Sequence, residues 1–154
     1  MIPDHALEQI ARHARDTYPA ECCGLLLAGA GGEIRFQPIA NVAGTKEGAA
    51  TSSRSQRDGY VMEPKALLDA LEATERAGGR LWAIVHSHPD VGAYFSSEDR
   101  RVALGGEDEP LWPGVRYLVV SVRAGRVDGA RLYAWDASAR DFLGEEVPAI
   151  ARFS

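Results

Sequence analysis

The sequence predicts an α/β fold: a single-domain sandwich in which a mixed central β-sheet is flanked by α-helices. Helical and strand-like segments alternate as helix, hairpin, helix, strand, helix and two further strands. The run 80–87 has the nearly continuous apolar character of a strand covered on both faces. A length of 154 residues is typical of one domain, and we find no repeat or boundary that divides it. We therefore expect one domain over residues 1–154.

The first quarter of the chain predicts a helix followed by a hairpin. The apolar residues of 4–17 recur at helical spacing, namely Leu7, Ile10, Ala11 and Ala14. Residues 22–30 form a short apolar run typical of a buried strand. Gly31 and Gly32 then favour a turn, and 33–42 returns as the second strand of the hairpin.

The next segment predicts a loop and then a helix. Residues 44–59 are rich in Gly, Ser, Thr and Arg and have no periodicity. A loop of this length is often functional, although a tolerated surface insertion explains it equally well. Pro64 suits the first turn of a helix that runs to Gly78. The face of that helix is expected to carry Leu67, Leu68, Leu71 and Thr74.

The second half predicts the central strand, a short helix and two more strands. The strand is 80–87, and the helix covers 96–104. After a loop at 105–114, residues 115–122 and 127–135 are expected to be strands. The residues beyond 135 have weak periodicity, so their form stays open.

Composition and charge exclude several classes of partner. The chain is 45% hydrophobic and 25% charged, as expected for a globular protein with a proper core, and its formal net charge is −5. This acidic balance gives no support for nucleic-acid binding, and no basic run suggests a membrane surface. No apolar stretch reaches the roughly 18 residues of a membrane span, and the N-terminus lacks the apolar region of a signal peptide. We expect a cytoplasmic protein.

The two cysteines are adjacent. Cys22 and Cys23 have Cα atoms about 3.8 Å apart, which is below the usual disulfide range. They also lack the spacing of a metal or redox pair. We expect reduced thiols that serve packing, with a redox or substrate-contacting role as the alternative.

The stretch HSHPDVGAYFSSED, residues 86–99, carries the predicted chemistry. If the strand continues through His88, then His86 and His88 point to one face, with their Cα atoms about 6–7 Å apart. Two imidazoles at that separation can share one ion at about 2.0–2.1 Å per bond. The ten-residue connection lets Asp99 approach from a helix start. Two histidines, one carboxylate and one bound water are typical of a catalytic zinc site.

A metal-free interpretation of the same stretch stays open. His-x-His occurs by chance, and Ser96-x-x-Asp99 is also a capping-box pattern. However, His86 and His88 are two of only four histidines and end an apolar strand, where α/β folds place their sites. We therefore favour the metal. The other two, His5 and His13, are expected to lie on the surface.

A hydrolytic zinc site also needs a base and an oxyanion donor. Glu21 immediately precedes the buried strand, where desolvation would raise its proton affinity; the alternative is a solvated charge. Glu98 and Asp90 lack a comparable fixed placement. The Ser96 hydroxyl could donate a hydrogen bond to the oxyanion of a scissile carbonyl, or simply cap the helix.

Together these residues resemble the JAMM (MPN+) zinc metalloproteases, particularly their bacterial and archaeal branch. The shared pattern is a distant glutamate, His-x-His, ten residues and an aspartate, with a serine three places before it. Here these are Glu21, His86, His88, Asp99 and Ser96. The flanking text also matches: AECCGLLLAG, Asn41 followed by YVMEP, LWAIVHSHP and VRYLVVSV. The resemblance covers roughly residues 5–135 and identifies 1–154 as a JAMM/MPN+ domain.

The resemblance implies a cytidine-deaminase-like fold that binds a single zinc ion and its water. His86, His88 and Asp99 would be the ligands, Glu21 would hold and deprotonate the water, and Ser96 would stabilise the tetrahedral intermediate. The family cleaves amide and isopeptide bonds next to the C-terminal tail of ubiquitin-like proteins. Prokaryotic members resemble enzymes that process sulfur carriers ending in Gly-Gly. Such a tail can bind as an added strand.

The chain departs from the family pattern inside the metal-binding stretch. Phe95 stands where the family usually has proline, and Gly92, Ala93 and Tyr94 replace residues that often include further prolines. These changes leave the ligand set intact but bear on loop rigidity and substrate fit. Some relatives fold an insertion near the position of 44–59 over the substrate tail.

Three alternatives accompany the isopeptidase hypothesis. The chain could hydrolyse small amides or short peptides, or it could be a non-catalytic MPN-type binding module, although such modules have generally lost ligands. A nucleobase deaminase is disfavoured because its H-x-E and P-C-x-x-C motifs are missing. The oligomeric state stays open, with a homodimer as one option.

Overall fold

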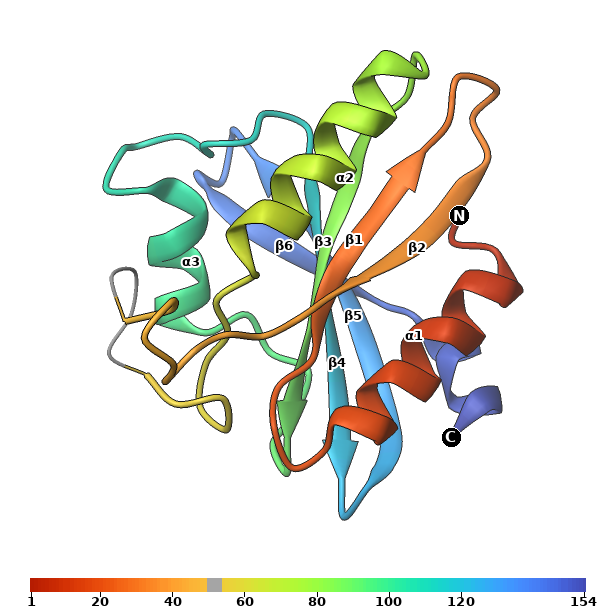
Figure 1. Cartoon of the computed structure of the whole chain (residues 1–154), viewed down its shortest axis with the longest axis vertical. Coiled ribbons are helices and arrows are strands. Elements are labelled where there is room, and N and C mark those ends of the chain that lie inside the picture. Colours follow the sequence, from red (N-terminus) through yellow and green to blue (C-terminus); the bar gives the residue numbers. More distant parts are fainter. Residues whose placement is uncertain (50–53) are drawn as a thin grey trace.

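The computed structural model describes residues 1–49 and 54–154 and is built on a six-stranded sheet (Figure 1). The strand order is β2-β1-β3-β4-β5-β6, and β3 and β4 are parallel while the other neighbours are antiparallel. The strands are β1 (Cys23–Ala28), β2 (Ile34–Ile39), β3 (Arg80–Pro89), β4 (Arg116–Arg123), β5 (Arg126–Asp136) and β6 (Asp141–Glu146). The predicted mixed sheet is confirmed, with β3 between β1 and β4.

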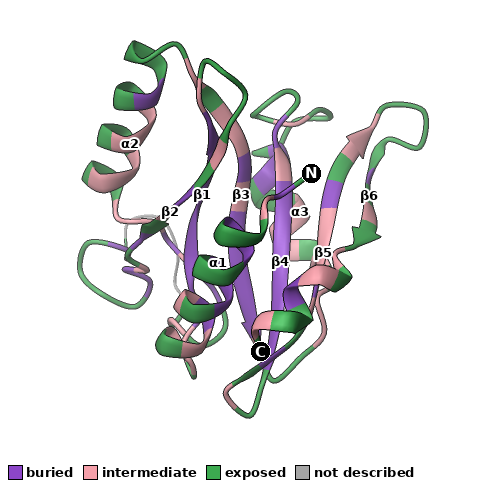
Figure 2. Ribbon diagram, turned by 90° about the vertical axis from the view of Figure 1, so that its right-hand side faces the viewer, coloured by how far each residue is buried: buried purple, intermediate pink, exposed green. Residues whose placement is uncertain are grey.

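Helices cover both faces of this sheet. On one face, α1 (Asp4–Thr17) and a 3₁₀ helix (Pro148–Phe153) pack over alternate residues of the central strands, among them Leu26, Val85 and Val120. Figure 2 shows α1 lying across this face. On the other face, α2 (Pro64–Arg76) packs over β1, and α3 (Ser97–Leu104) packs over β4. The sandwich therefore has three layers.

Period-two alternation along the strands decides what each face receives. In β4, Leu118 and Val120 face the α1 side, and Tyr117 and Val119 face α3. In β3, Val85 faces α1, so the residues on either side of it in sequence face α2 and α3. The two faces of the sheet therefore differ. The face under α1 is an apolar core, and the face under α2 and α3 carries the polar residues at the end of β3.

Most predicted elements are confirmed, and the differences have local causes. The chain after 135 forms the end of β5, then β6 and the 3₁₀ helix. Leu68 does not join the packing face of α2 and is 55% exposed. It lies about 100° further round the helix than Leu67, away from Ala66 and Ala70, which pack on the sheet.

Two further predictions concern the predicted loop and the first helix. In the loop, 44–49 and 54–59 form turns and irregular backbone, whereas 50–53 fall outside the described residues. His13 is not a surface residue: it is half-buried beside Phe36, and one ring nitrogen lies 3.3 Å from the carbonyl oxygen of Cys23. His5 is exposed as expected.

Both cysteines are free and buried, as predicted. Burial raises the pKa of Cys22 to about 12, and it raises the pKa of Cys23 further. The Cys23 thiol donates to the Ile39 carbonyl oxygen at 3.4 Å. Protonated, buried thiols of this kind fit a packing role. Within 1–49 and 54–154, no helix has both the length and the apolar character needed to cross a membrane.

Candidate metal centre

The two histidines of the stretch 86–99 lie near the carboxyl end of β3. Their strand is paired on both sides: His86 lies opposite Cys23 of β1, and His88 lies opposite Ser121 of the parallel strand β4. Both rings are on the face covered by α2 and α3. Ser87 points the other way, where its hydroxyl accepts a hydrogen bond from the Cys22 amide at 2.8 Å.

A capping box at the start of α3 fixes the carboxylate. The Ser96 hydroxyl accepts from the Asp99 amide at 3.0 Å, and Asp99 Oδ2 accepts from the Ser96 amide at 2.9 Å. The cap uses a lone pair of the Ser96 oxygen, and no hydrogen bond among the described residues uses its O–H. The capping function and the proposed donor function of Ser96 are therefore compatible. Asp99 caps the helix with one oxygen while both of its oxygens face β3.

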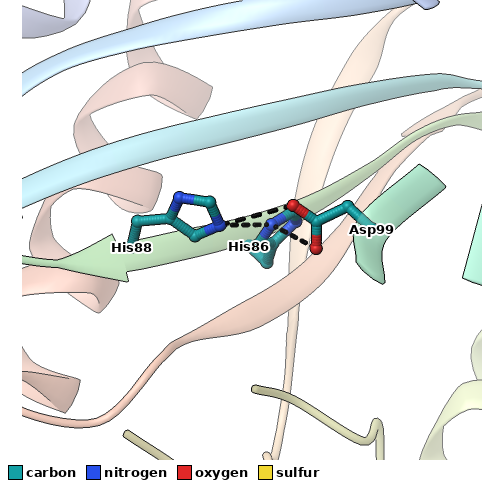
Figure 3. A group of neighbouring side chains, drawn as sticks. All are labelled: His86, His88 and Asp99. Carbon is teal, nitrogen blue, oxygen red and sulfur yellow. Dashed lines mark hydrogen bonds and ion pairs between the residues drawn. The ribbon is translucent and has the colours of Figure 1, made fainter. Parts of the chain in front are cut away.

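The three side chains converge on one point, as Figure 3 shows. His86 Nε2 and His88 Nε2 are 3.2 Å apart, Asp99 Oδ1 is 3.3 Å from His86 Nε2, and Asp99 Oδ2 is 3.4 Å from His88 Nε2. Ligands with bonds of about 2.0–2.1 Å to a tetrahedral zinc ion lie about 3.3 Å from one another. Two imidazole nitrogens and one carboxylate at this spacing fit zinc and leave one coordination position open.

Burial and the attraction between opposite charges shift the pKa values of these three side chains. Burial alone would raise the pKa of Asp99, but hydrogen bonds from His86 and His88 outweigh it and hold that pKa well below its usual value. Burial lowers the pKa of His86. It also acts to lower the pKa of His88, but there the attraction of Asp99 and Glu21 prevails and raises it. The cluster thus favours an ionised carboxylate, which is the form that binds a cation.

Different contacts fix the two imidazole rings. His88 Nδ1 lies 3.1 Å from the Gly92 carbonyl oxygen, and the edge of Tyr94 packs on this ring at 4.9 Å. His86 Nδ1 is buried with no hydrogen-bond partner among the described residues, and Tyr60 stacks on that ring at 4.7 Å. Sequence reasoning missed these roles of Gly92, Tyr60 and Tyr94, because no spacing rule links them to the histidines.

Glu21 shares a cleft of about 600 Å³ with His88, Ser96 and Asp99. It is buried at the start of β1, with a side chain only 6% exposed. Burial raises the pKa of Glu21 to about 8, against the opposing attraction of His88. The predicted placement of this carboxyl against the edge of the core agrees with this position. A carboxyl group with a pKa near neutrality can both accept and return a proton.

Asn41 connects Glu21 to the cleft wall. Its amide nitrogen donates to the carbonyl oxygens of Glu21 at 3.0 Å and Gly59 at 3.1 Å. Its amide oxygen accepts from the backbone of Ala43 and Val61, both at 3.0 Å. All four hydrogen-bonding positions of this side chain are therefore used. Among the sequence features, only the family resemblance had pointed to Asn41.

Comparison with known proteins assigns the chain to a family. Residues 3–136 match the family described as prokaryotic homologs of the JAB domain. The chain belongs to this family. This JAB-family chain is 31% identical over 122 residues to a desampylase of Haloferax volcanii, a match spanning 75% of this chain and 76% of that protein.

Two further similarities extend this result. A Thermus thermophilus protein named "Probable TtuB-protein conjugate cleaving protease" is 36% identical over 102 residues, covering 66% of this chain and 62% of that protein. A solution structure of a protein from Desulfitobacterium hafniense has a TM-score of 0.64 at 23% identity, covering 94% of this chain and 86% of that one. The last likeness is one of fold.

Proposed function

We propose that this protein is a zinc-dependent isopeptidase of JAMM type, with His86, His88 and Asp99 as the zinc ligands. The observation that carries the proposal is the convergence of two imidazole nitrogens 3.2 Å apart and one carboxylate, whose two oxygens lie 3.3 and 3.4 Å from them. His88 and Asp99 line the same cleft as Glu21. Two imidazoles and one carboxylate are a zinc set that leaves a position open for catalysis. We propose further that residues 1–154 are one domain of cytidine-deaminase-like type.

Glu21 is the proposed base of the reaction. A zinc ion bound to His86, His88 and Asp99 would polarise the scissile carbonyl and make a water molecule more acidic. The Glu21 carboxylate takes the proton as that water attacks the carbonyl carbon. The same carboxyl then returns the proton to the amine that leaves, so the group ends the cycle ionised. The raised pKa of Glu21 makes its carboxylate a stronger proton acceptor than an exposed one.

Ser96 is the proposed oxyanion donor. The cap fixes its oxygen at the start of α3, and its O–H is available to the negative charge that develops on the scissile carbonyl oxygen. A donor fixed in advance stabilises that charge without reorganising during the reaction. The capping box therefore places Asp99 and Ser96 next to each other at the start of α3.

The proposed substrate is an amide or isopeptide bond at the C-terminal Gly-Gly tail of a ubiquitin-like or sulfur-carrier protein. Two relatives carry the names of conjugate-cleaving enzymes, and this supports the substrate class. The cleft also supports it, because polar groups at its metal end adjoin an apolar part that includes Met62, Leu67 and Ile84. Hydrolysis of a short peptide or small amide is the second candidate, because the same chemistry serves both.

One experiment tests the function and separates these substrates. The purified protein is analysed for zinc and then incubated with a ubiquitin-like protein joined through Gly-Gly to a lysine side chain. We expect about one zinc per chain, release of the lysine-bearing partner and loss of cleavage after chelation. Cleavage of a short Gly-Gly peptide at equal efficiency would favour the small-substrate alternative. A folded, zinc-loaded protein that cleaves neither substrate would contradict the enzyme and favour a binding module.

A further inference from the structure

Hydrogen bonds tether the loop that follows β3 along its length. This loop has no proline between Pro89 and Pro110 to stiffen it. Three successive carbonyl oxygens of the loop nevertheless each meet a side-chain donor. The Val91 carbonyl accepts from the Ser121 hydroxyl at 2.6 Å, that of Gly92 lies 3.1 Å from His88 Nδ1, and that of Ala93 accepts from the Tyr133 hydroxyl at 2.8 Å.

The donors come from three neighbouring strands. His88 is in β3, Ser121 in β4 and Tyr133 in β5, and all three side chains are buried. They lie in the interior of the hydrogen-bonded sheet, so the atoms that hold the loop have little freedom themselves. The loop is thus fixed against the centre of the sheet.

Both ends of the loop are also fixed. At its start, the Asp90 carboxylate accepts from the Ala124 amide at 2.9 Å and the Tyr18 hydroxyl at 2.8 Å. At its end, Phe95 packs among aromatic rings at centroid distances of 4.9–5.2 Å. These rings belong to Tyr117, Tyr133 and Phe142. Tyr133 therefore contacts the loop twice, by its hydroxyl and by its ring.

The central bond of the three reaches the proposed metal centre. A carbonyl oxygen can only accept, so the bond to Gly92 requires the proton of His88 on Nδ1. This leaves the Nε2 lone pair for a metal ion and fixes the plane of the ring. The position of the Gly92 oxygen depends on its two neighbours, which Ser121 and Tyr133 hold.

We propose that Ser121 and Tyr133 are positioning residues of the metal centre. Their hydroxyls hold the loop so that Gly92 keeps the proton of His88 on Nδ1 and aims Nε2 at the shared ion. Neither hydroxyl touches the ion or the substrate. This inference rests on the proposed zinc site and adds two residues, 33 and 45 positions after His88 in sequence, that tune it.

The matched control comes from the same aromatic cluster. Tyr117 is buried beside Phe95, and its hydroxyl makes no hydrogen bond among the described residues. Tyr133→Phe and Ser121→Ala each delete one tether, and Tyr117→Phe deletes a hydroxyl that tethers nothing. All three substitutions remove one oxygen and add no bulk. Any general effect of losing a buried hydroxyl therefore appears in the control.

The first measurement is zinc affinity by competition with a chelator, together with the visible spectrum of the cobalt-substituted protein. Because one hydrogen bond contributes about 1 kcal/mol, we expect each tether variant to bind zinc about 3- to 10-fold more weakly. The double variant should lose about 10- to 100-fold, within the range found for groups that support metal ligands. The cobalt bands should shift in the tether variants and stay unchanged in Tyr117→Phe.

The second measurement needs no metal. Hydrogen exchange of the segment 90–95 in the metal-free protein should be faster in Tyr133→Phe and Ser121→Ala than in Tyr117→Phe. A wild-type protein that binds no zinc would contradict the proposed function. A wild-type protein that binds zinc, with tether variants equal to the control in affinity, cobalt spectrum and exchange, would overturn this inference alone.

Discussion

At the scale of single residues, the candidate site uses side chains for two purposes at once. Asp99 caps a helix and faces both histidines, and Ser96 caps the same helix with its lone pair while keeping its O–H. Because each side chain serves both purposes, removing it changes the stability of the protein and its activity together. The informative variants are those that separate the two roles.

Ser96→Gly separates capping from catalysis. Glycine is a tolerated N-cap that costs only about a few tenths of a kcal/mol, whereas alanine costs about 1 kcal/mol. Both variants lose the O–H, so we expect kcat to fall by about 100- to 1,000-fold in each, with KM little changed. Only Ser96→Ala should also lower the unfolding midpoint. Steady-state kinetics and denaturant unfolding check this, and full kcat in Ser96→Gly would exclude the donor role.

His13 predicts a pH dependence of stability. Burial lowers its pKa from the usual 6.5, against a weaker opposing effect of its bond to the Cys23 carbonyl. The unfolded state therefore binds this proton at higher pH than the folded state. The stabilisation from neutral His13 is present above pH 6.5 and is lost as the pH falls through the lower, folded-state pKa.

Replacing His13 by glutamine should flatten the decline of stability below pH 6.5. His5→Gln is the matched control, because His5 lies exposed on the same helix. The measurement is the free energy of unfolding from denaturant titrations between pH 7.5 and 5. An equal pH slope in wild type and His13→Gln would refute the assigned burial effect.

At the scale of elements, two irregular segments flank the end of β3, and each is held by side-chain hydrogen bonds. The segment 90–96 is tied through Ser121 and Tyr133. The opposite wall of the cleft, near 59–61, is tied through Asn41, which also holds the backbone of Glu21. A few polar side chains thus hold the backbone on both sides of the cleft.

Asn41→Ala should loosen that wall without touching the proposed zinc ligands. Four hydrogen bonds are lost, so we expect a decrease of about 2–4 kcal/mol in the free energy of unfolding. Cleavage should also fall while zinc content stays the same, because Glu21 is displaced and the ligands are not. Gln37→Ala, at a half-buried position of β2 outside the cleft lining, is the control. Loss of zinc along with activity would show that Asn41 acts on the metal centre instead.

At the scale of the whole molecule, the parts that follow from local pattern could be predicted and the long-range contacts could not. Alternation along β3 gave His86 and His88 a common face, and the spacing of Ser96 and Asp99 indicated a capping box. Continuous hydrophobicity identified the central strand. Each of these signals lies within a dozen residues of the chain.

The contacts that could not be predicted join residues that are distant in sequence. Ser121 meets Val91 across 30 positions, Tyr133 meets Ala93 across 40, and Asn41 meets Glu21 across 20. No periodicity encodes such pairs, because the fold alone brings them together. Strand β6 was missed for a related reason: its burial is irregular, since it is an edge strand with only Phe142 fully inside.

Glu21→Gln tests most directly whether Glu21, buried beside the proposed zinc ligands, is the base of amide hydrolysis. The substitution keeps size and shape but cannot take a proton. Cleavage of the Gly-Gly conjugate is measured in wild type, Glu21→Gln and Glu98→Gln, with zinc content determined on the same samples. Glu98 lines the same cleft, but its carboxylate is paired with Arg101.

We predict that Glu21→Gln retains about one zinc per chain and loses about 100- to 10,000-fold in kcat, while Glu98→Gln stays close to wild type. Undiminished cleavage by zinc-loaded Glu21→Gln would contradict the account.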